Sequence, residues 1–111
     1  MQIALTTTGR MTGRPRTVTL YGWEQQGALV VVGSDGGSKD DPAWVGNLRA
    51  DPHAVVRRGT REMAVEAREL SGVERDRAWE TVVGRFPLYG TYQHRTARRI
   101  PLFLLVPPDH A

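Results

Sequence analysis

The sequence predicts a protein of the α+β class, a small antiparallel β-barrel of about six strands with short helices. β-prone runs recur along the chain, and turn signals join most of them, so neighbouring strands are expected to pair locally. Two intervening segments instead carry apolar residues at helical spacing. The chain has 111 residues, of which 40% are hydrophobic, so we expect one modest core and a single domain over residues 1–111.

The first three strands are predicted at residues 3–8, 16–23 and 28–32. In the second, Val18 and Leu20 share one face, which places Tyr21 on the other face, toward a groove or solvent. The third is a continuous apolar run, typical of a central strand buried on both faces. The loop between the first two contains Gly9, Gly13 and two arginines, and Arg16 follows at the start of the second strand, so the N–H groups and side chains of this stretch suit a phosphate or a carboxylate.

A loop of small residues, 33–38, follows the third strand and leads into a helix predicted over residues 43–50. Asp41 is the expected N-cap of this helix and Pro42 its first residue, because Asp caps helices and proline suits the first turn. A strand, a small-residue loop and a helix N-terminus in succession commonly hold the polar edge of a ligand. The sequence has no Gly-Lys-Ser/Thr phosphate loop, so this indication is weaker than a true phosphate-binding motif.

The second half of the chain predicts a hairpin, a helix and a last strand. The strands are predicted at 53–58, 61–70 and 100–106. Alternation in the second arm of the hairpin directs Met63, Val65 and Ala67 inward. Ser71 and Glu74 have the spacing of a capping box, so a helix is expected to begin there and to end at the next proline.

Three aromatic residues, Phe86, Tyr89 and Tyr92, follow at intervals of three. A helical turn would align their rings on one side. Two interpretations remain open: a packed helix with partly buried rings, or an aromatic wall over a flat ligand.

The charge pattern indicates an anionic partner, either a small ligand or a nucleic acid, because the net charge is +3 and the pI about 9.9. The arginines gather in three groups, which are Arg10, Arg14 and Arg16, then Arg57, Arg58 and Arg61, and then Arg95, Arg98 and Arg99. No acidic residue precedes Glu24, so the first group lacks a local counter-charge, although arginines that only improve solubility remain an alternative. For the third group a solvated surface is favoured. The aromatic residues lie mostly in predicted helices, which argues against a base-stacking surface.

Several kinds of chemistry are excluded. The chain has no cysteine, its three histidines lack metal-ligand spacing, and it contains neither a nucleophile elbow nor a dinucleotide-binding glycine motif. No apolar run approaches the roughly 20 residues that cross a bilayer, and the first residues do not read as a signal peptide, so a cytoplasmic location is expected. We therefore expect any reaction to belong to a bound cofactor, without a metal.

Six stretches carry a resemblance to a known family. They are Thr6-Thr7-Thr8-Gly9-Arg10, Gly13-Arg14-Pro15-Arg16, Val31-Val32-Gly33-Ser34-x-Gly36-Gly37, Pro42-Ala43-Trp44-x-x-Asn47-Leu48, Pro87-x-Tyr89-x-x-Tyr92-Gln93-x-x-Thr96 and Arg99-Ile100-Pro101. Together they resemble the deazaflavin-dependent nitroreductase family of actinobacteria over nearly the whole chain. The resemblance implies a split β-barrel related to flavin-binding oxidoreductases. It also implies an enzyme that uses coenzyme F420, an 8-hydroxy-5-deazaflavin, to reduce quinones, nitroaromatics and other activated unsaturated compounds.

The resemblance also implies a set of site residues. Those implied to bind the coenzyme are Arg10, Met11, Thr12, Arg16, Thr17, Val18, Val32, Gly33, Ser34, Asp35, Ala43, Trp44, Asn47 and Tyr89. The coenzyme has a flat ring and an anionic tail, and the arginines and threonines would hold the tail. The hydroxyl groups implied to orient the acceptor and to supply a proton belong to Tyr21, Ser34, Tyr89 and Tyr92.

Three departures from the family pattern alter these expectations. Met11 and Asp35 stand at positions that are often basic, so weaker binding of the tail is expected. Phe86 stands where nitro-reducing members carry tyrosine, which weakens the case for nitroimidazole reduction. The first predicted strand begins within Met1–Ile3, whereas family members usually have a longer N-terminal segment before it; this predicts a truncated or a minimal member.

Two alternatives belong to other classes of function. One is a non-catalytic protein that binds a deazaflavin or a flavin, with FMN as the less favoured cofactor. The other, weaker still, is a small basic barrel that binds nucleic acid. With the enzyme we expect a small hydrophobic acceptor, no nucleic acid, a monomer or a homodimer, and peripheral contact with a membrane as an open question.

Overall fold

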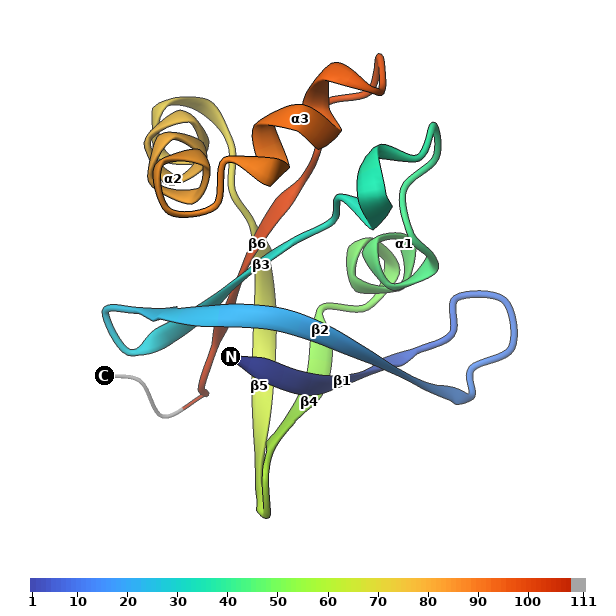
Figure 1. Cartoon of the computed structure of the whole chain (residues 1–111). Coiled ribbons are helices and arrows are strands. Elements are labelled where there is room, and N and C mark those ends of the chain that lie inside the picture. Colours follow the sequence, from blue (N-terminus) through green and yellow to red (C-terminus); the bar gives the residue numbers. More distant parts are fainter. Residues whose placement is uncertain (109–111) are drawn as a thin grey trace.

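The computed structural model describes residues 1–108 and shows a closed β-barrel within them (Figure 1). The strands are β1 (Gln2–Thr8), β2 (Pro15–Gln25), β3 (Ala28–Val32), β4 (His53–Arg58), β5 (Arg61–Glu69) and β6 (Leu102–Val106). They pair antiparallel around the barrel in the order β1-β2-β3-β6-β5-β4. The predicted fold class and the predicted hairpins are confirmed.

Three pairings join segments that are distant in the sequence, and one of them places β5 beside β6. β6 lies beside β3, where Val31 is opposite Phe103, and β4 closes the barrel against β1, where Leu5 is opposite Val56. All four of these side chains are buried, so the hydrophobic core stabilises the pairs that local turns cannot specify.

Short helices cover one side of the barrel in Figure 1. They are η1 (Asp35–Gly37), α1 (Ala43–Ala50), α2 (Gly72–Arg85) and α3 (Leu88–His94). α1 packs against β1, α2 against β6 and α3, and α3 against η1. Within the described residues no helix is long and apolar enough to span a bilayer.

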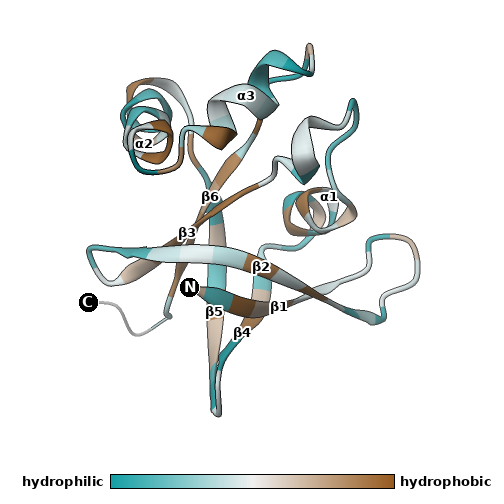
Figure 2. Ribbon diagram, in the orientation of Figure 1, coloured by the Kyte–Doolittle hydropathy of each residue, from teal (hydrophilic) through white to brown (hydrophobic). Residues whose placement is uncertain are grey.

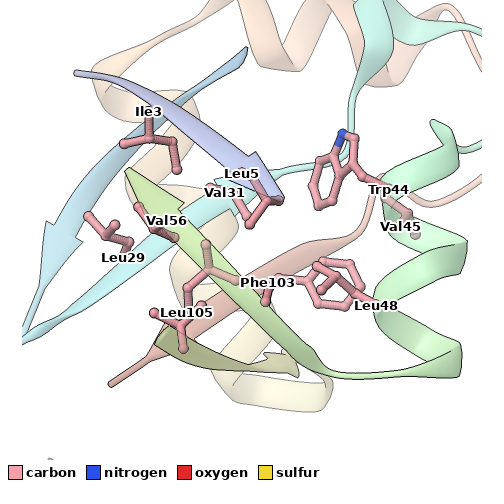
Figure 3. Packing of buried hydrophobic residues seen from close by; sticks show 12 residues of the cluster. Ile3, Leu5, Leu29, Val31, Trp44, Val45, Leu48, Val56, Phe103 and Leu105 are labelled. Carbon is pink, nitrogen blue, oxygen red and sulfur yellow. The ribbon is translucent and has the colours of Figure 1, made fainter. Parts of the chain in front are cut away.

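The interior of the barrel is filled from the strands and from α1. Figure 3 shows Trp44 and Leu48 reaching from α1 toward the strands, and the rings of Trp44 and Phe103 meet edge to face, 5.8 Å apart between centroids. Because α1 contributes three fully or nearly fully buried side chains to this cluster, it acts as a plug at one end of the barrel.

A second cluster lies on the outer face of the sheet. Val30 and Val32 of β3 pack there with Ala78 and Val82 of α2, while Val31 points into the barrel. This arrangement confirms that β3 is buried on both faces, and it explains the uninterrupted brown of β3 in Figure 2.

Two predicted helix starts are wrong in detail. Pro42 rather than Asp41 occupies the N-cap of α1, because the carboxylate of Asp41 pairs with Arg49, at 2.9 Å, and with another arginine described below. Ser71 is the N-cap of α2, but its side chain makes no capping hydrogen bond, and Glu74 pairs with Arg68 instead of closing a capping box. Ion pairs with other elements outcompete the local capping bonds.

The inward face predicted for β5 is also wrong at one position. Val65 is buried, with 3% of its surface exposed, whereas Met63 is 36% exposed. Met63 is close to the tip of the β4–β5 hairpin, which extends away from the helices in Figure 1 and is teal at its end in Figure 2. The alternation of apolar and polar residues therefore extends along β5 into a part of the strand that does not pack against the core.

Glycine at position 37 is required by a close approach. Gly37 has a φ of +82°, and a Cβ atom there would lie 2.6 Å from the backbone oxygen of Tyr92 in α3. The neighbouring Gly36 also has a positive φ, +63°, but a Cβ atom there would meet nothing within 4 Å. At both positions a residue with a side chain would be strained by the positive φ. Only at position 37 would the side chain also clash with a neighbouring element.

We therefore predict that Gly37→Ala lowers the free energy of unfolding by about 3 kcal/mol, because strain and backbone overlap add. Gly36→Ala is the matched control and should cost about 1 kcal/mol, from backbone strain alone. Urea unfolding followed by circular dichroism measures both values. Equal losses would show that α3 shifts freely away from η1.

Candidate functional site

The loop between β1 and β2 is compact and attached to α1. The N–H of Gly9 donates to the oxygen of Arg14 at 2.8 Å, which closes the loop as the two glycines predicted. Asn47 of α1 is only 4% exposed, and its Oδ1 accepts from the backbone N–H and from Nη1 of Arg10, both at 3.1 Å. Its Nδ2 donates to Oγ1 of Thr7, also at 3.1 Å. One buried amide thus connects the loop, β1 and α1.

Two grooves meet beside α1. The first, which we call the loop groove, has a volume of about 470 Å³ and is lined by Thr7, Gly9, Arg10, Met11, Thr12, Arg16, Thr17, Val18, Pro42, Ala43, Trp44 and Asn47. The second, the tyrosine groove, has about 310 Å³ and is lined by Val18, Thr19, Leu20, Tyr21, Val32, Ser34, Asp35, Pro42, Trp44 and Tyr89. Because Val18, Pro42 and Trp44 line both, the two grooves adjoin each other, and together we call them the trough.

The loop groove is cationic. Arg10 and Arg16 line it together with the hydroxyl-bearing Thr12 and Thr17, and none of its lining residues carries a carboxylate. Arg10 extends over α1 and donates to the oxygen of Ala43 at 3.1 Å, so its guanidinium is held in place. This donor set suits phosphate or carboxylate oxygens.

The tyrosine groove is bordered by a chain of aromatic rings. Phe86 contacts Tyr21 at 5.3 Å and Tyr89 at 6.1 Å between ring centroids, and Tyr89 contacts Tyr92 at 5.9 Å, all edge to face. Burial raises the pKa of the Tyr89 phenol above its ordinary value, and the neighbouring Tyr92 and Tyr21 raise it further. Tyr89 therefore stays protonated at neutral pH and can donate a hydrogen bond.

The β3–α1 segment, residues 33–41, forms the other border of the tyrosine groove. Gly33 lies between α1 and the start of β6, where a Cβ atom would approach side-chain atoms of Val45 and Pro101 to 2.8 Å. Asp35 has a φ of +43°, and its Oδ2 accepts from the hydroxyl of Ser38 at 3.1 Å. Asp35 lines the tyrosine groove and not the loop groove that holds the arginines.

The structure brings most of the predicted site residues together. Those in the loop groove are Arg10, Met11, Thr12, Arg16, Thr17, Val18, Ala43, Trp44 and Asn47. Those that line the tyrosine groove are Tyr21, Val32, Ser34, Asp35 and Tyr89. Gly33 and Tyr92 line neither groove: Gly33 begins the β3–α1 segment, and Tyr92 packs against the ring of Tyr89.

Sequence reasoning missed Arg98. The third arginine group was expected on a solvated surface, but the side chain of Arg98 is only 14% exposed and pairs with Asp41 at 2.7 Å. Arg99 fits the expectation, since its side chain is 64% exposed and pairs with Asp76 at the surface. Adjacent arginines in a loop have no local signal that separates them, so only the tertiary structure distinguishes the two.

The barrel belongs to the split-barrel class. Solved structures of low sequence identity share this fold, and the similarity to them shows only the fold. A pyridoxamine 5'-phosphate oxidase-like protein from Listeria innocua superposes with a TM-score of 0.67 at 14% identity, over 97% of this chain and 84% of that one. The particular family follows from the sequence: a model of the family "F420H(2)-dependent quinone reductase" matches residues 1–107. The chain belongs to this family.

Named relatives agree with the family assignment. The F420H(2)-dependent quinone reductase Rv1261c of Mycobacterium tuberculosis is 34% identical over 106 residues, which are 93% of this chain and 71% of the relative. A solved structure of an F420-H2 dependent reductase, FDR-A, is 37% identical with a TM-score of 0.82 and covers 94% of this chain and 92% of its own. The expected deazaflavin-dependent oxidoreductase, its cofactor F420 and quinone reduction are confirmed at the level of the family.

The buried amide of Asn47 generates a prediction about the loop. Asn47→Leu leaves the Thr7 hydroxyl and the Arg10 N–H without this partner, so we expect it to lower the free energy of unfolding by about 3 kcal/mol. The released loop should also be cut faster by trypsin after Arg10. The bond after Arg14 precedes a proline and resists trypsin, so the fragment masses identify the cleavage site.

Asn47→Asp is the matched comparison. It keeps an oxygen acceptor for Arg10, and the Thr7 hydroxyl can donate to it, so a smaller loss and slower cleavage are expected. If both variants were cleaved at the wild-type rate, Asn47 would not hold the loop.

Proposed function

We propose that the domain, residues 1–111, binds reduced coenzyme F420 along the trough and passes its hydride to a quinone held at the tyrosine groove. One observation carries the proposal: a cationic groove without carboxylates adjoins an aromatic groove bordered by hydroxyl groups. The two halves match a ligand that has an anionic tail at one end and a flat ring at the other.

The residues of the loop groove fit the tail. The guanidinium groups of Arg10 and Arg16 offer paired N–H donors for phosphate and carboxylate oxygens, and the hydroxyls of Thr12 and Thr17 add neutral ones. Arg10 is already oriented by Asn47 and Ala43, so ordering its side chain costs little on binding. Met11 is 88% exposed at the groove and supplies apolar contact in place of a further positive charge.

The residues of the tyrosine groove fit the ring and the acceptor. Val18, Val32 and Trp44 give the groove an apolar floor, and the backbone at Ser34 and Asp35 forms one edge. When bound, reduced F420 supplies the hydride. The protonated Tyr89 hydroxyl orients an acceptor oxygen and can supply a proton to it, with Tyr21, Ser34 and Tyr92 as the other proposed hydroxyl donors.

The proposal extends to partners and location. The acceptor is a small hydrophobic molecule, and the protein acts in the cytoplasm as a monomer or homodimer, with peripheral membrane contact through exposed apolar residues such as Met11. A solved structure at 37% identity, with a TM-score of 0.83 over 94% of this chain and 78% of its own, is described as a domain-swapped dimer. Light scattering with and without vesicles would test both assembly and membrane contact.

The decisive experiment is a fluorescence titration with F420 and with FMN, followed by an assay with menadione on whichever binds. Binding of F420 without oxidation by any quinone would instead favour the non-catalytic carrier. Preferential binding of FMN would contradict the cofactor assignment for this chain.

We predict that Arg16→Ala weakens F420 binding by about 10- to 100-fold, because a charge-assisted hydrogen bond contributes about 1.5–3 kcal/mol. The side chain is exposed at the edge of β2, so the melting temperature should hardly change. Arg14→Ala is the matched control: it removes an arginine of the same loop that does not line the groove. If both substitutions weakened F420 binding equally, the arginines would act through the overall positive charge of the loop rather than through a direct contact of Arg16 with the coenzyme.

We also predict that Tyr89→Phe lowers turnover by about tenfold or more while F420 affinity changes less, because only the hydroxyl is removed. Stopped-flow oxidation of the bound coenzyme measures turnover, and fluorescence titration measures affinity. A proportional fall in both would show that Tyr89 acts through ring packing.

A further inference from the structure

We propose that Arg98 is a positioning residue: it holds the β3–α1 segment, residues 33–41, in the shape that borders the tyrosine groove. Arg98 does not itself line the groove, so it acts through Ser34 and Asp35, which do. Its effect on coenzyme binding rests on the proposed function, whereas its effect on the order of the segment does not.

The guanidinium of Arg98 bonds to both ends of the segment and to its middle. Nη1 donates to the oxygen of Gly33 at 3.0 Å, Nη2 to the oxygen of Ser34 at 2.8 Å, and Nε to the oxygen of Ser38 at 2.9 Å. Nη1 also donates to Oδ1 of Asp41 at 2.7 Å. Three backbone carbonyls and one carboxylate thus converge on a single, mostly buried side chain.

The segment has a few hydrogen bonds of its own, mainly those of Ser38 with Asp35 and Asp40, but its backbone conformation is unfavourable. Asp35, Gly36 and Gly37 all have positive φ, and the only regular structure is the single turn η1. Glycine-rich backbone loses much entropy when it is ordered. A planar guanidinium has five N–H donors in fixed directions, so one side chain can satisfy several carbonyls at once.

Arg98 is itself held from α3. The Nε2 of Gln93 donates to the oxygen of Arg98 at 2.7 Å, and its Oε1 accepts from the N–H of Ile100 at 3.0 Å. The amide side chain of Gln93 therefore forms hydrogen bonds with the backbone on both sides of residue 99. This assigns a purpose to Gln93, which stood in the sequence stretch from Pro87 to Thr96 without a role.

A second support reaches Arg98 through Asp41. The other oxygen of this carboxylate pairs with Arg49 of α1, and Arg49 also pairs with Glu69 at the end of β5, at 2.8 Å. Charges alternate along this chain of four residues, so each cation lies beside an anion. The segment is consequently tied to α1 and to the barrel wall as well as to α3.

The expected consequence is selective. Loss of Arg98 should loosen the edge of the tyrosine groove and leave the loop groove intact, because Asn47 and Arg10 hold that groove independently. Affinity for the ring end of the coenzyme should therefore fall, while the contribution of the tail stays the same. Arg16→Ala should show the opposite pattern.

The test compares Arg98→Ala with Arg99→Ala, an adjacent exposed arginine that pairs with Asp76 and has no bond to the segment. Hydrogen exchange of peptides covering residues 33–41 is measured on the ligand-free protein. Arg98→Ala should speed this exchange by about tenfold or more, and Arg99→Ala should leave it unchanged.

Binding is measured with F420 and with 8-hydroxy-5-deazariboflavin, which has the ring but no tail. Arg98→Ala should weaken both by the same factor, about tenfold, so that their affinity ratio is preserved. Arg16→Ala should weaken the binding of F420 alone, and so lower the ratio of the affinity for F420 to the affinity for 8-hydroxy-5-deazariboflavin. Unchanged exchange over residues 33–41, or an altered ratio in Arg98→Ala, would overturn the proposal.

Arg98→Lys keeps the test decisive if the alanine variant does not fold. A lysine ammonium can pair with Asp41 but cannot reach three carbonyls in fixed directions, so faster exchange over 33–41 in a folded protein supports the proposal. Wild-type exchange in Arg98→Lys would overturn it. If the wild-type protein failed to bind F420, the proposed function would fall, and the exchange experiment would still decide the role of Arg98.

Discussion

The insertion of α1 into the end of the barrel is the interaction on which the site depends. Trp44 and Leu48 are buried with Phe103 in the core, and the burial of such side chains contributes about 1.5–3 kcal/mol each. The same short helix presents Ala43 and Asn47 to the loop groove. Core packing fixes the position of α1. The residues of α1 that line the loop groove are therefore held by the core, and not only by contacts at the surface.

The buried side chain of Asn47 and the mostly buried side chain of Arg98 then shape the two grooves. Asn47 holds the loop after β1, and Arg98 holds the segment after β3. In each case a side chain from one element satisfies backbone groups of another, in a region where an unpaired polar group would cost about 1–3 kcal/mol. These two side chains thus order the two loops that border the grooves.

Local patterns predicted most of the fold, and short motifs predicted many of the residues that line the two grooves. The hairpin turns and the spacing of the aromatic residues reflect interactions between close neighbours in the chain, whereas the apolar run of β3 reflects burial on both faces; all three are confirmed. The predictions fail at Asp41, Glu74 and Met63. Ion pairs drew the two acids away from capping, and Met63 lies where the hairpin has left the core.

The residue pattern alone determined the class of fold, the family and the residue types along the trough, because these follow from periodicity and from short motifs. The tertiary structure decided that, of two adjacent arginines, Arg99 is exposed at the surface and Arg98 is mostly buried and bonded to the β3–α1 segment. Arg98 and Arg99 have the same chemistry and are adjacent in the sequence. Only the approach of the β3–α1 segment, 57 to 65 residues away in the chain, gives Arg98 its partners.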